Sequence, residues 1–272
     1  MPHFFRPALL ALFTASSLVA TTPLDVNSTL PSRFSFGLDV IRLNVATTMI
    51  NQTVTGTNTL KGLRMGYDII KPNSPYFGYH LLATLNQAKF DFTPQEGAAY
   101  DGLEPRKTCA PLINTEVRFG QTFAGQGALS TLFFGFGSYL LDYPFEAFLA
   151  DEKDHAFHET FIYLTGGALI SYAFGPSMTV GCHLKAMWCW KSFETATYDE
   201  PFFCYKNQQG TRSLTYGNKE KKWGGEMGVP ITWRPAKLPS LEVQLEPYYL
   251  SLATHRGTAR GFGARLLLGS RF

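Results

Sequence analysis

The chain ends in GFGARLLLGSRF at residues 261–272, a stretch with strict two-residue alternation. The opposite face of this stretch carries glycines together with Leu267 and Arg265. Because successive side chains of a strand point to opposite faces, the pattern predicts a β-strand that runs to the last residue. Taken alone, the strand suits a soluble β-protein as well as a membrane barrel. Counted back from the terminal Phe272, its first face carries small and apolar side chains, those of Ser270, Leu268, Leu266, Ala264 and Phe262.

This strand resembles the C-terminal strand of bacterial outer-membrane β-barrels. In that class, a terminal aromatic residue and alternating apolar side chains form a signal that the insertion machinery reads. The resemblance implies this role for Leu266, Leu268 and Phe272. It also implies outer-membrane lipid and the barrel-insertion machinery as partners.

The composition favours an all-β protein over a helical membrane protein. Aromatic residues make up 15% of the 272 residues and charged residues only 17%, which is below the roughly 25% of average soluble domains. The formal net charge of +3 is too small to indicate a nucleic-acid partner. Beyond the extreme N-terminus no run approaches the about 20 apolar residues that a membrane-spanning helix needs, so helical spans are excluded.

The N-terminus has the features of a secretory signal, which predicts export. Arg6 supplies a positive charge, and residues 8–20 form a short apolar run that ends in small residues. This run is too short to span a bilayer as a helix. We therefore predict a signal peptide at residues 1–20, a short lead at residues 21–33 and a β-barrel domain at residues 34–272.

Two-residue alternation recurs throughout the expected barrel domain. Each segment places apolar residues on one face and small, polar or charged residues on the other. Pro230 interrupts one segment and predicts a bulge or an edge there, because proline cannot donate to the ladder. The pattern predicts about ten strands, with eight to twelve possible, at residues 34–46, 59–70, 76–85, 112–123, 128–141, 157–173, 178–190, 223–233, 241–250 and 261–272.

The connections between these segments alternate in length. Short turns follow the second, fourth, sixth and eighth predicted strands, and a modest connection follows the ninth. Short periplasmic turns opposite longer extracellular loops are typical of outer-membrane barrels, and aromatic residues near the strand ends suit the two interfacial belts. We therefore predict an all-β, antiparallel transmembrane β-barrel in the bacterial outer membrane; a soluble, lipocalin-like barrel with its apolar face inside is the alternative. The longer segments follow the odd-numbered strands, at residues 47–58, 86–111, 142–156 and 191–222.

If the apolar faces meet lipid, the opposite faces line the lumen and carry charges of both signs. A buried charge without a partner is costly, so we expect ion pairs across the lumen, with Arg265 paired to Asp39 or Glu242. A ten-stranded barrel is close in size to eight-stranded barrels, whose interior is filled by side chains, so we predict a salt-bridged polar core. A narrow water-filled pore for small solutes is the alternative. The predicted lumen charges are Asp39, Arg64, Asp68, Glu116, Arg118, Lys185, Glu226, Glu242, Glu246 and Arg265, together with His80, Glu159, His183 and Arg271.

The four cysteines suggest at most one disulfide. None has CxxC spacing, so we predict neither a metal site nor a cofactor. Cys109 and Cys204 fall in two of the long loops, and a disulfide between them is our hypothesis. Cys182 and Cys189 lie on one strand with opposite parity, so they face opposite sides and are expected to be packing residues.

An enzymatic function has weak support. The ten-stranded omptin proteases use extracellular Asp and His residues to activate water, and the comparable cluster here lies at residues 151–159. Asp154 and His155 are adjacent and would point apart on a strand, so the resemblance is poor. We predict a structural or surface-interaction barrel rather than an enzyme, with its long loops, at residues 86–111 and 191–222, as the contact surface for an extracellular ligand or protein. A hydrolase that uses Asp154 and His158 is a further alternative.

Overall fold

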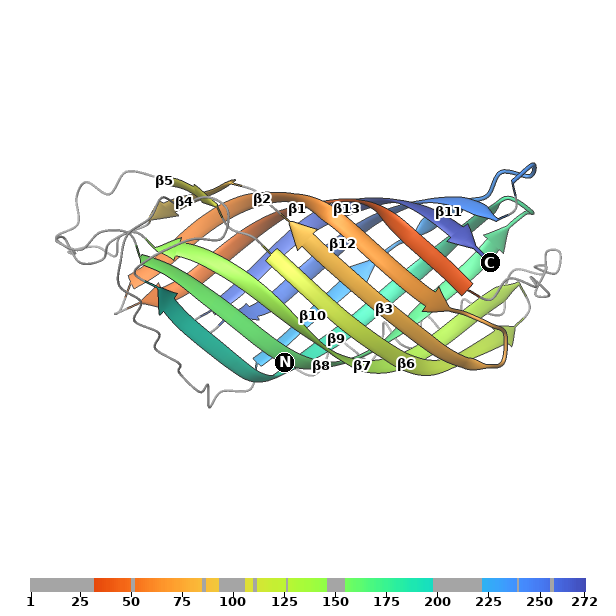
Figure 1. Ribbon diagram of the computed structural model, residues 1–272, viewed down its shortest axis with the longest axis horizontal. Helices are drawn as coiled ribbons and strands as arrows, with labels where there is room; N and C mark the ends of the chain where they lie inside the picture. The colour runs from red at the N-terminus through yellow and green to blue at the C-terminus, as the bar shows by residue number, and fades with distance from the viewer. Residues whose placement is uncertain are drawn as a thin grey trace, which may run out of the picture.

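The chain forms a single antiparallel sheet that is rolled into a barrel (Figure 1). The computed structural model describes residues 32–49, 52–84, 87–92, 106–109, 112–125, 127–145, 155–197, 222–238, 240–254 and 257–272. Among these residues there is no helix of the length and apolarity needed to cross a membrane. The strand segments are β1 (Ser32–Met49), β2 (Gln52–Ile69), β3 (Pro75–Thr84), β4 (Gln87–Phe92), β5 (Arg106–Cys109), β6 (Leu112–Gly125), β7 (Ala128–Phe145), β8 (His155–Phe174), β9 (Met178–Thr197), β10 (Lys222–Gly228), β11 (Ile231–Trp233), β12 (Leu241–Thr254) and β13 (Gly257–Arg271).

The barrel closes because its first strand pairs with its last. β1 is antiparallel to β13 on one side and to β2 on the other. Three pairs of consecutive segments each occupy one strand position. β3 and β4 both pair with β2, β5 and β6 pair with β4 and β3, and β10 and β11 both lie between β9 and β12. The described sheet is therefore a closed ten-stranded barrel, which confirms the predicted fold class.

The interruption between β10 and β11 lies at Val229 and Pro230. Proline carries no backbone N–H, so it cannot donate to the ladder. The Pro230 carbonyl instead accepts from the Gly181 N–H at 2.7 Å, and the Val229 N–H donates to the Pro247 carbonyl at 3.0 Å. The chain thus stays bonded to both neighbouring strands while it passes the proline, and the predicted defect in this strand is confirmed.

The outer surface next to the short turns is an apolar belt. Its most exposed members include Phe262 at 74% and Phe134 at 67% of their possible area. The inward positions of the same strand stretches carry the charged residues. An apolar exterior over a charged interior is the arrangement of a transmembrane barrel, so the soluble alternative is wrong. Other exposed members of the belt are Phe34, Phe36, Leu38, Val40, Leu63, Phe119, Leu132, Phe136, Leu164, Met227, Leu245, Leu266 and Leu268.

The polarity of the two faces inverts further along the strands, towards the long connections. On β1 the outward face changes from Val40 to Arg42, while the inward face changes from Asp39 to the buried Ile41 and Leu43. Beyond the belt, the wall formed by β13, β1 and β2 is therefore polar outside and apolar inside, as a soluble barrel would be, whereas Trp190 and Trp223 remain exposed on the outside of β9 and β10. The wall of the barrel continues past the membrane-facing belt. The same outward change occurs on the strands beside β1, from Leu63 to Lys61 on β2 and from Phe262 to Arg260 on β13.

The segments predicted as long loops are in part strand. In residues 47–58, β1 and β2 remain paired as far as Met49 opposite Gln52. Residues 86–111 contain the paired β4 and β5, β7 and β8 reach into residues 142–156, and β9 extends to Thr197. The loop predictions are wrong at these places because the ladder uses main-chain hydrogen bonds, so a polar, Thr-rich segment can continue a strand beyond the apolar belt.

Candidate functional site in the barrel lumen

Three layers of side chains fill the described lumen. Nearest the long connections is an apolar layer in which every side chain is nearly or fully buried. Below it, an ion-pair layer comprises Asp39, Glu116, Glu226 and Glu246 with Arg64, Arg118, Lys185 and Arg265. At the short-turn end, a mouth cluster comprises Glu242 with Arg33, Arg234 and Arg271. The apolar layer contains Ile41, Leu43, Val45, Leu60, Leu82, Leu112, Tyr139, Leu141, Phe161, Tyr163, Met187, Cys189, Tyr248, Leu250, Leu252, Ala253 and Ala259.

Arg265 is the centre of the ion-pair layer. The registers place Asp39 of β1 and Glu246 of β12 directly opposite it on the two strands that flank β13. Its Nε donates to Asp39 Oδ2 at 3.1 Å, its Nη1 to Glu246 Oε1 at 3.2 Å, and its Nη2 to Glu226 Oε1. Only a guanidinium offers donors in this fixed fork, so one side chain joins β13 to three other strands, β1, β10 and β12.

The ion-pair layer continues from Arg265 across the lumen. Lys185 Nζ lies 3.0 Å from Glu226 Oε2 and 2.9 Å from Glu116 Oε2, and β6, which carries Glu116, is separated from β9 by two strands. Glu116 also accepts from Arg118, and Arg64 Nε donates to Asp39 Oδ2 at 3.0 Å. Four carboxylates thus meet four cations, and the layer is electrically balanced.

Buried tyrosines complete the hydrogen bonding of these carboxylates. Tyr248 donates to Asp39, Tyr163 donates to Glu116 Oε2 at 2.7 Å, and Tyr76 donates to Asp68 Oδ1 at 2.7 Å. The Arg265 guanidinium carbon lies 3.7 Å from the centre of the Tyr248 ring, a cation–π contact. Each buried charge therefore has several partners, which is the condition for such a network to be stable.

Gly263 leaves room for the Tyr248 ring because it has no side chain. The two residues are directly opposed on β13 and β12, and a Cβ at position 263 would lie 2.5 Å from Tyr248 Cζ. We expect Gly263→Ala to lower the free energy of unfolding by about 1–3 kcal/mol, because the ring must move away from Arg265 and Asp39. Urea titration of the folded barrel measures this loss. Gly125→Ala is the matched control, since nothing lies within 4 Å of its Cβ, and an equal loss in both variants would contradict the explanation.

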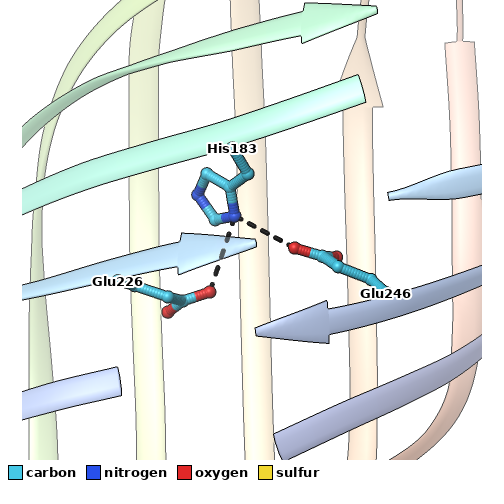
Figure 2. Close-up of side chains that lie close together, drawn as sticks. All are labelled: His183, Glu226 and Glu246. Carbon is cyan, nitrogen blue, oxygen red and sulfur yellow. Dashed lines mark hydrogen bonds and ion pairs between the residues drawn. The ribbon is translucent and has the colours of Figure 1, made fainter. Parts of the chain in front are cut away.

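His183, Glu226 and Glu246 lie close enough to be considered as metal ligands (Figure 2). His183 Nδ1 is 3.2 Å from Glu246 Oε1 and 3.6 Å from Glu226 Oε1, and one ligand atom of each residue falls within 4.8 Å of the others. However, both of these oxygens already accept from Arg265. Since a guanidinium supplies the positive charge that a metal would bring, the donor set fits an ion-pair network better than a metal centre.

The mouth cluster differs from the ion-pair layer in its charge. Glu242 accepts from Arg271 Nε at 3.0 Å and from Arg234 Nε at 3.3 Å, and it also pairs with Arg33. Arg33 reaches Gln244 as well. Three arginines therefore share one carboxylate. The prediction that Arg265 pairs with Asp39 or Glu242 is right for Asp39 and wrong for Glu242, because Glu242 lies opposite Gly269, nearer the short-turn end.

A cavity of about 160 Å³ lies between the mouth cluster and the ion-pair layer. Six arginines line it, against three carboxylates, those of Asp68, Glu242 and Glu246. His80 also lines it, with Nε2 at 3.1 Å from Asp68 Oδ1. The six arginines are Arg33, Arg64, Arg118, Arg234, Arg265 and Arg271.

The structure places thirteen of the fourteen predicted lumen residues inside the barrel; the side chain of the other, Glu159, lies outside the described part of the chain. Ten of the thirteen are buried, and Arg64, His80 and Arg271 are half-buried. They do not form one ion-pair network, because Glu242 pairs with the arginines of the mouth cluster and Asp68 pairs with His80, while the charges of the ion-pair layer join around Arg265 and Glu116. Reasoning from sequence missed Arg33, Arg234 and the tyrosines. Arg33 shares the face of Ser35 and Asp39, so extending the first predicted strand by one residue would have found it.

Several predictions fall on residues outside the described part of the chain. These are the signal peptide, most of the lead, Cys204 with its disulfide to Cys109, and Asp154 of the hydrolase cluster. The side chains of His158 and Glu159 also lie outside it. Leu266, Leu268 and Phe272 are exposed on the outer surface, and their role in insertion stays a prediction. Cys182 and Cys189 are thiols on opposite faces of β9, with Cys189 buried in the lumen.

No protein-family model matches the chain, and no curated protein matches it. Solved structures do match. The outer membrane protease OmpT from Escherichia coli has 10% identity and a TM-score of 0.55, over 89% of this chain and 96% of that chain. The translocator domain of autotransporter NalP from Neisseria meningitidis has 11% identity and a TM-score of 0.48, over 98% of this chain and 94% of that chain.

The attachment invasion locus protein Ail of Yersinia pestis has 11% identity and a TM-score of 0.36, over 89% of this chain and 97% of that chain. Sequence identities this low can show a shared fold and nothing more. Of these three structures, only OmpT superimposes well enough to support a shared fold. That overlap agrees with the closure, the strand count and the apolar belt described above. The chain therefore has the fold of a bacterial outer-membrane β-barrel.

Proposed function

We propose that this chain is a non-conducting barrel of the bacterial outer membrane that acts as a surface-interaction protein. It would contact an extracellular ligand or protein through the part of its wall beyond the apolar belt and through the connections at that end. Membrane lipid surrounds the belt, and the insertion machinery would read the terminal strand. The observation that carries this proposal is the inversion of polarity between the belt and the apolar layer.

The inverted part of the barrel is suited to water on its outside. There the outward residues include Arg42, Lys61 and Arg260, each exposed, while the inward residues form the apolar layer. A charged side chain facing lipid is costly, so this part of the wall belongs outside the hydrocarbon. β4, β7 and β9 end at this end of the barrel, at Phe92, Phe145 and Thr197. Loops held on a rigid scaffold are common binding surfaces.

The apolar layer also argues against a pore. Ile41, Leu43, Leu60, Leu141 and Leu252 have no exposed area, and the packed side chains of this layer come from strands all around the barrel. Below them, the ion-pair layer bridges opposite walls through Lys185 and Glu116. A solute would have to displace both layers to cross the barrel. The narrow pore is thus the second candidate, and the cavity at the short-turn end is the feature in its favour.

Recordings in planar bilayers test the choice between these two functions. We expect the folded chain to give no steady channel openings, because the apolar layer blocks a continuous path of water through the lumen. A trimeric porin reconstituted in the same way serves as the positive control. Stable unitary conductance of the wild-type barrel would overturn the proposal in favour of the pore.

The hydrolase remains a separate proposal with weaker support, resting on the sequence of residues 151–159. Peptide cleavage by the wild-type barrel that is lost in both Asp154→Asn and His158→Gln would establish it. Cleavage that persists in these variants would exclude these residues from the chemistry.

A further inference from the structure

We propose that the cavity between the mouth cluster and the ion-pair layer binds a small anion of the phosphate type, admitted from the short-turn end. The site would be formed by Arg33, Arg234 and Arg271 around Glu242. This binding function is distinct from surface interaction, because it lies at the opposite end of the barrel.

The charge of the mouth cluster carries the inference. Three guanidinium groups meet a single carboxylate, so the side chains of the cluster have a net charge of +2. In the ion-pair layer, by contrast, four carboxylates balance four cations. Asp68 belongs to neither group and also lines the cavity, so the excess at the mouth is +2 for the cluster and +1 when Asp68 is included. Clustered positive charges in a low-dielectric wall repel one another, and a bound anion relieves that repulsion.

The surroundings of the mouth extend the positive potential outwards. The short turns at residues 70–74, 126–127, 175–177 and 234–240 contain no Asp or Glu, but they contain Lys71, Arg234 and Lys237. Lys71 and Lys237 are exposed. Fixed charges of one sign around a cleft raise the local concentration of the opposite ion and speed its association. An anion would thus be steered to the mouth.

The shape and polarity of the cavity suit a ligand with several acceptor oxygens. Its volume of about 160 Å³ is more than a phosphate group requires, given that one water needs roughly 10–15 Å³ on the same measure. At its inner end His183, which is 5% exposed, has an Nε2 atom without a hydrogen-bond partner among the described residues. Because Nδ1 faces the carboxylates of Glu226 and Glu246, Nε2 is the ring nitrogen that is left to form a hydrogen bond with a ligand oxygen or hydroxyl.

The choice of a phosphate group follows from matching charge and geometry. A phosphate carries one or two negative charges, which matches the excess of +1 to +2 at the mouth, and the planar fork of arginine binds two oxygens of a phosphate at once. A headgroup of the surrounding bilayer cannot be the source, because these arginines point into the lumen while lipid lies outside the wall. The ligand is therefore expected to be a soluble phosphate or phosphate monoester.

Isothermal titration of the folded full chain in detergent with inorganic phosphate tests the site, with acetate at equal ionic strength as the monoanion control. We expect saturable binding of phosphate and weaker binding of acetate. Arg234→Gln should weaken phosphate binding about tenfold, the effect of losing one charge-assisted hydrogen bond. Arg234 is the most exposed of the three arginine side chains, at 26%, so its replacement disturbs the barrel least.

Two further variants make the result decisive. Lys237→Gln removes an exposed charge in the same turn outside the cavity, and its affinity should stay within about twofold of the wild type. Glu242→Gln removes the internal competitor and should tighten binding, the opposite sign to Arg234→Gln. Absence of saturable binding, equal losses in Arg234→Gln and Lys237→Gln, or no gain in Glu242→Gln would each overturn the proposal. Phosphate binding at one end of the barrel does not depend on whether the barrel conducts, so this test fails independently of the conductance test.

Discussion

Arg265→Gln is expected to lower the free energy of unfolding of the barrel by about 3–5 kcal/mol, which is the usual cost of removing one partner from a buried ion pair. Arg265 is 2% exposed and donates to Asp39, Glu226 and Glu246. Without it, these three carboxylates keep only Arg64 and Lys185 as cationic partners, and the layer acquires a net negative charge. The remaining repulsion is felt in a low dielectric, where it is large.

A denaturant titration measures this loss, with the heat-dependent gel mobility of the folded barrel as its readout. Arg260→Gln is the matched control, because it removes the same charge from the same strand at an exposed, outward position, and a change within about 0.5 kcal/mol is expected. Arg265→Lys should lie between the two, since it keeps the charge but loses the fork of donors. A loss as small in Arg265→Gln as in Arg260→Gln would mean that the network does not hold the strands together.

Phe134→Arg is expected to destabilise the barrel in a bilayer by about 2–4 kcal/mol, because it places a charge against hydrocarbon. Phe134 is 67% exposed and lies between two other outward apolar residues of β7, Leu132 and Phe136. In a soluble barrel, the same substitution at an exposed position would change stability little. The size of the effect therefore reports whether lipid covers this surface.

Thr59→Arg provides the comparison for this substitution. Thr59 is exposed on β2 and lies opposite Arg42, at the level where the outer face has become polar. Arginine there should cost no more than about 1 kcal/mol, as near a membrane interface. Refolding into phospholipid vesicles at increasing urea concentrations measures the free energy of unfolding of both variants. Equal effects at positions 59 and 134 would contradict the assignment of the apolar belt to lipid.

The architecture was predictable because it depends on local alternation. Phe34, Phe36, Leu38 and Val40 share a face with period two, and only a strand puts them on one surface. The number of such segments, together with the turn residues between them, predicts the strand count of the described barrel. The break in the strand at Pro230 was also predictable, because proline lacks a backbone N–H and cannot donate to the ladder at any position in a strand.

The extent of the strands was not predictable in the same way. Residues 47–58 carry mostly polar side chains, which are typical of loops, yet they continue β1 and β2. Main-chain hydrogen bonds hold these residues to a neighbouring strand that the belt has already aligned. The polarity of their side chains therefore does not predict that the strands continue. The change of polarity at Ile41 and Arg42 is present in the sequence. However, both halves of β1 alternate with period two, and alternation does not show which face of the strand lies inside the barrel.

Sequence by itself thus determined that the chain alternates with period two, that charges share the face opposite the aromatic residues, and that the last strand ends in an aromatic residue. These are properties of neighbouring residues, and the backbone geometry of a strand converts them directly into faces. Tertiary structure alone decided which charges meet. Arg265 pairs with Asp39, far away in sequence, because closure brings β1 beside β13, whereas Glu242 is shifted towards Arg33, Arg234 and Arg271 by the register of β12. Ion pairing depends on distances of a few ångströms, and only the closed and registered sheet sets those distances.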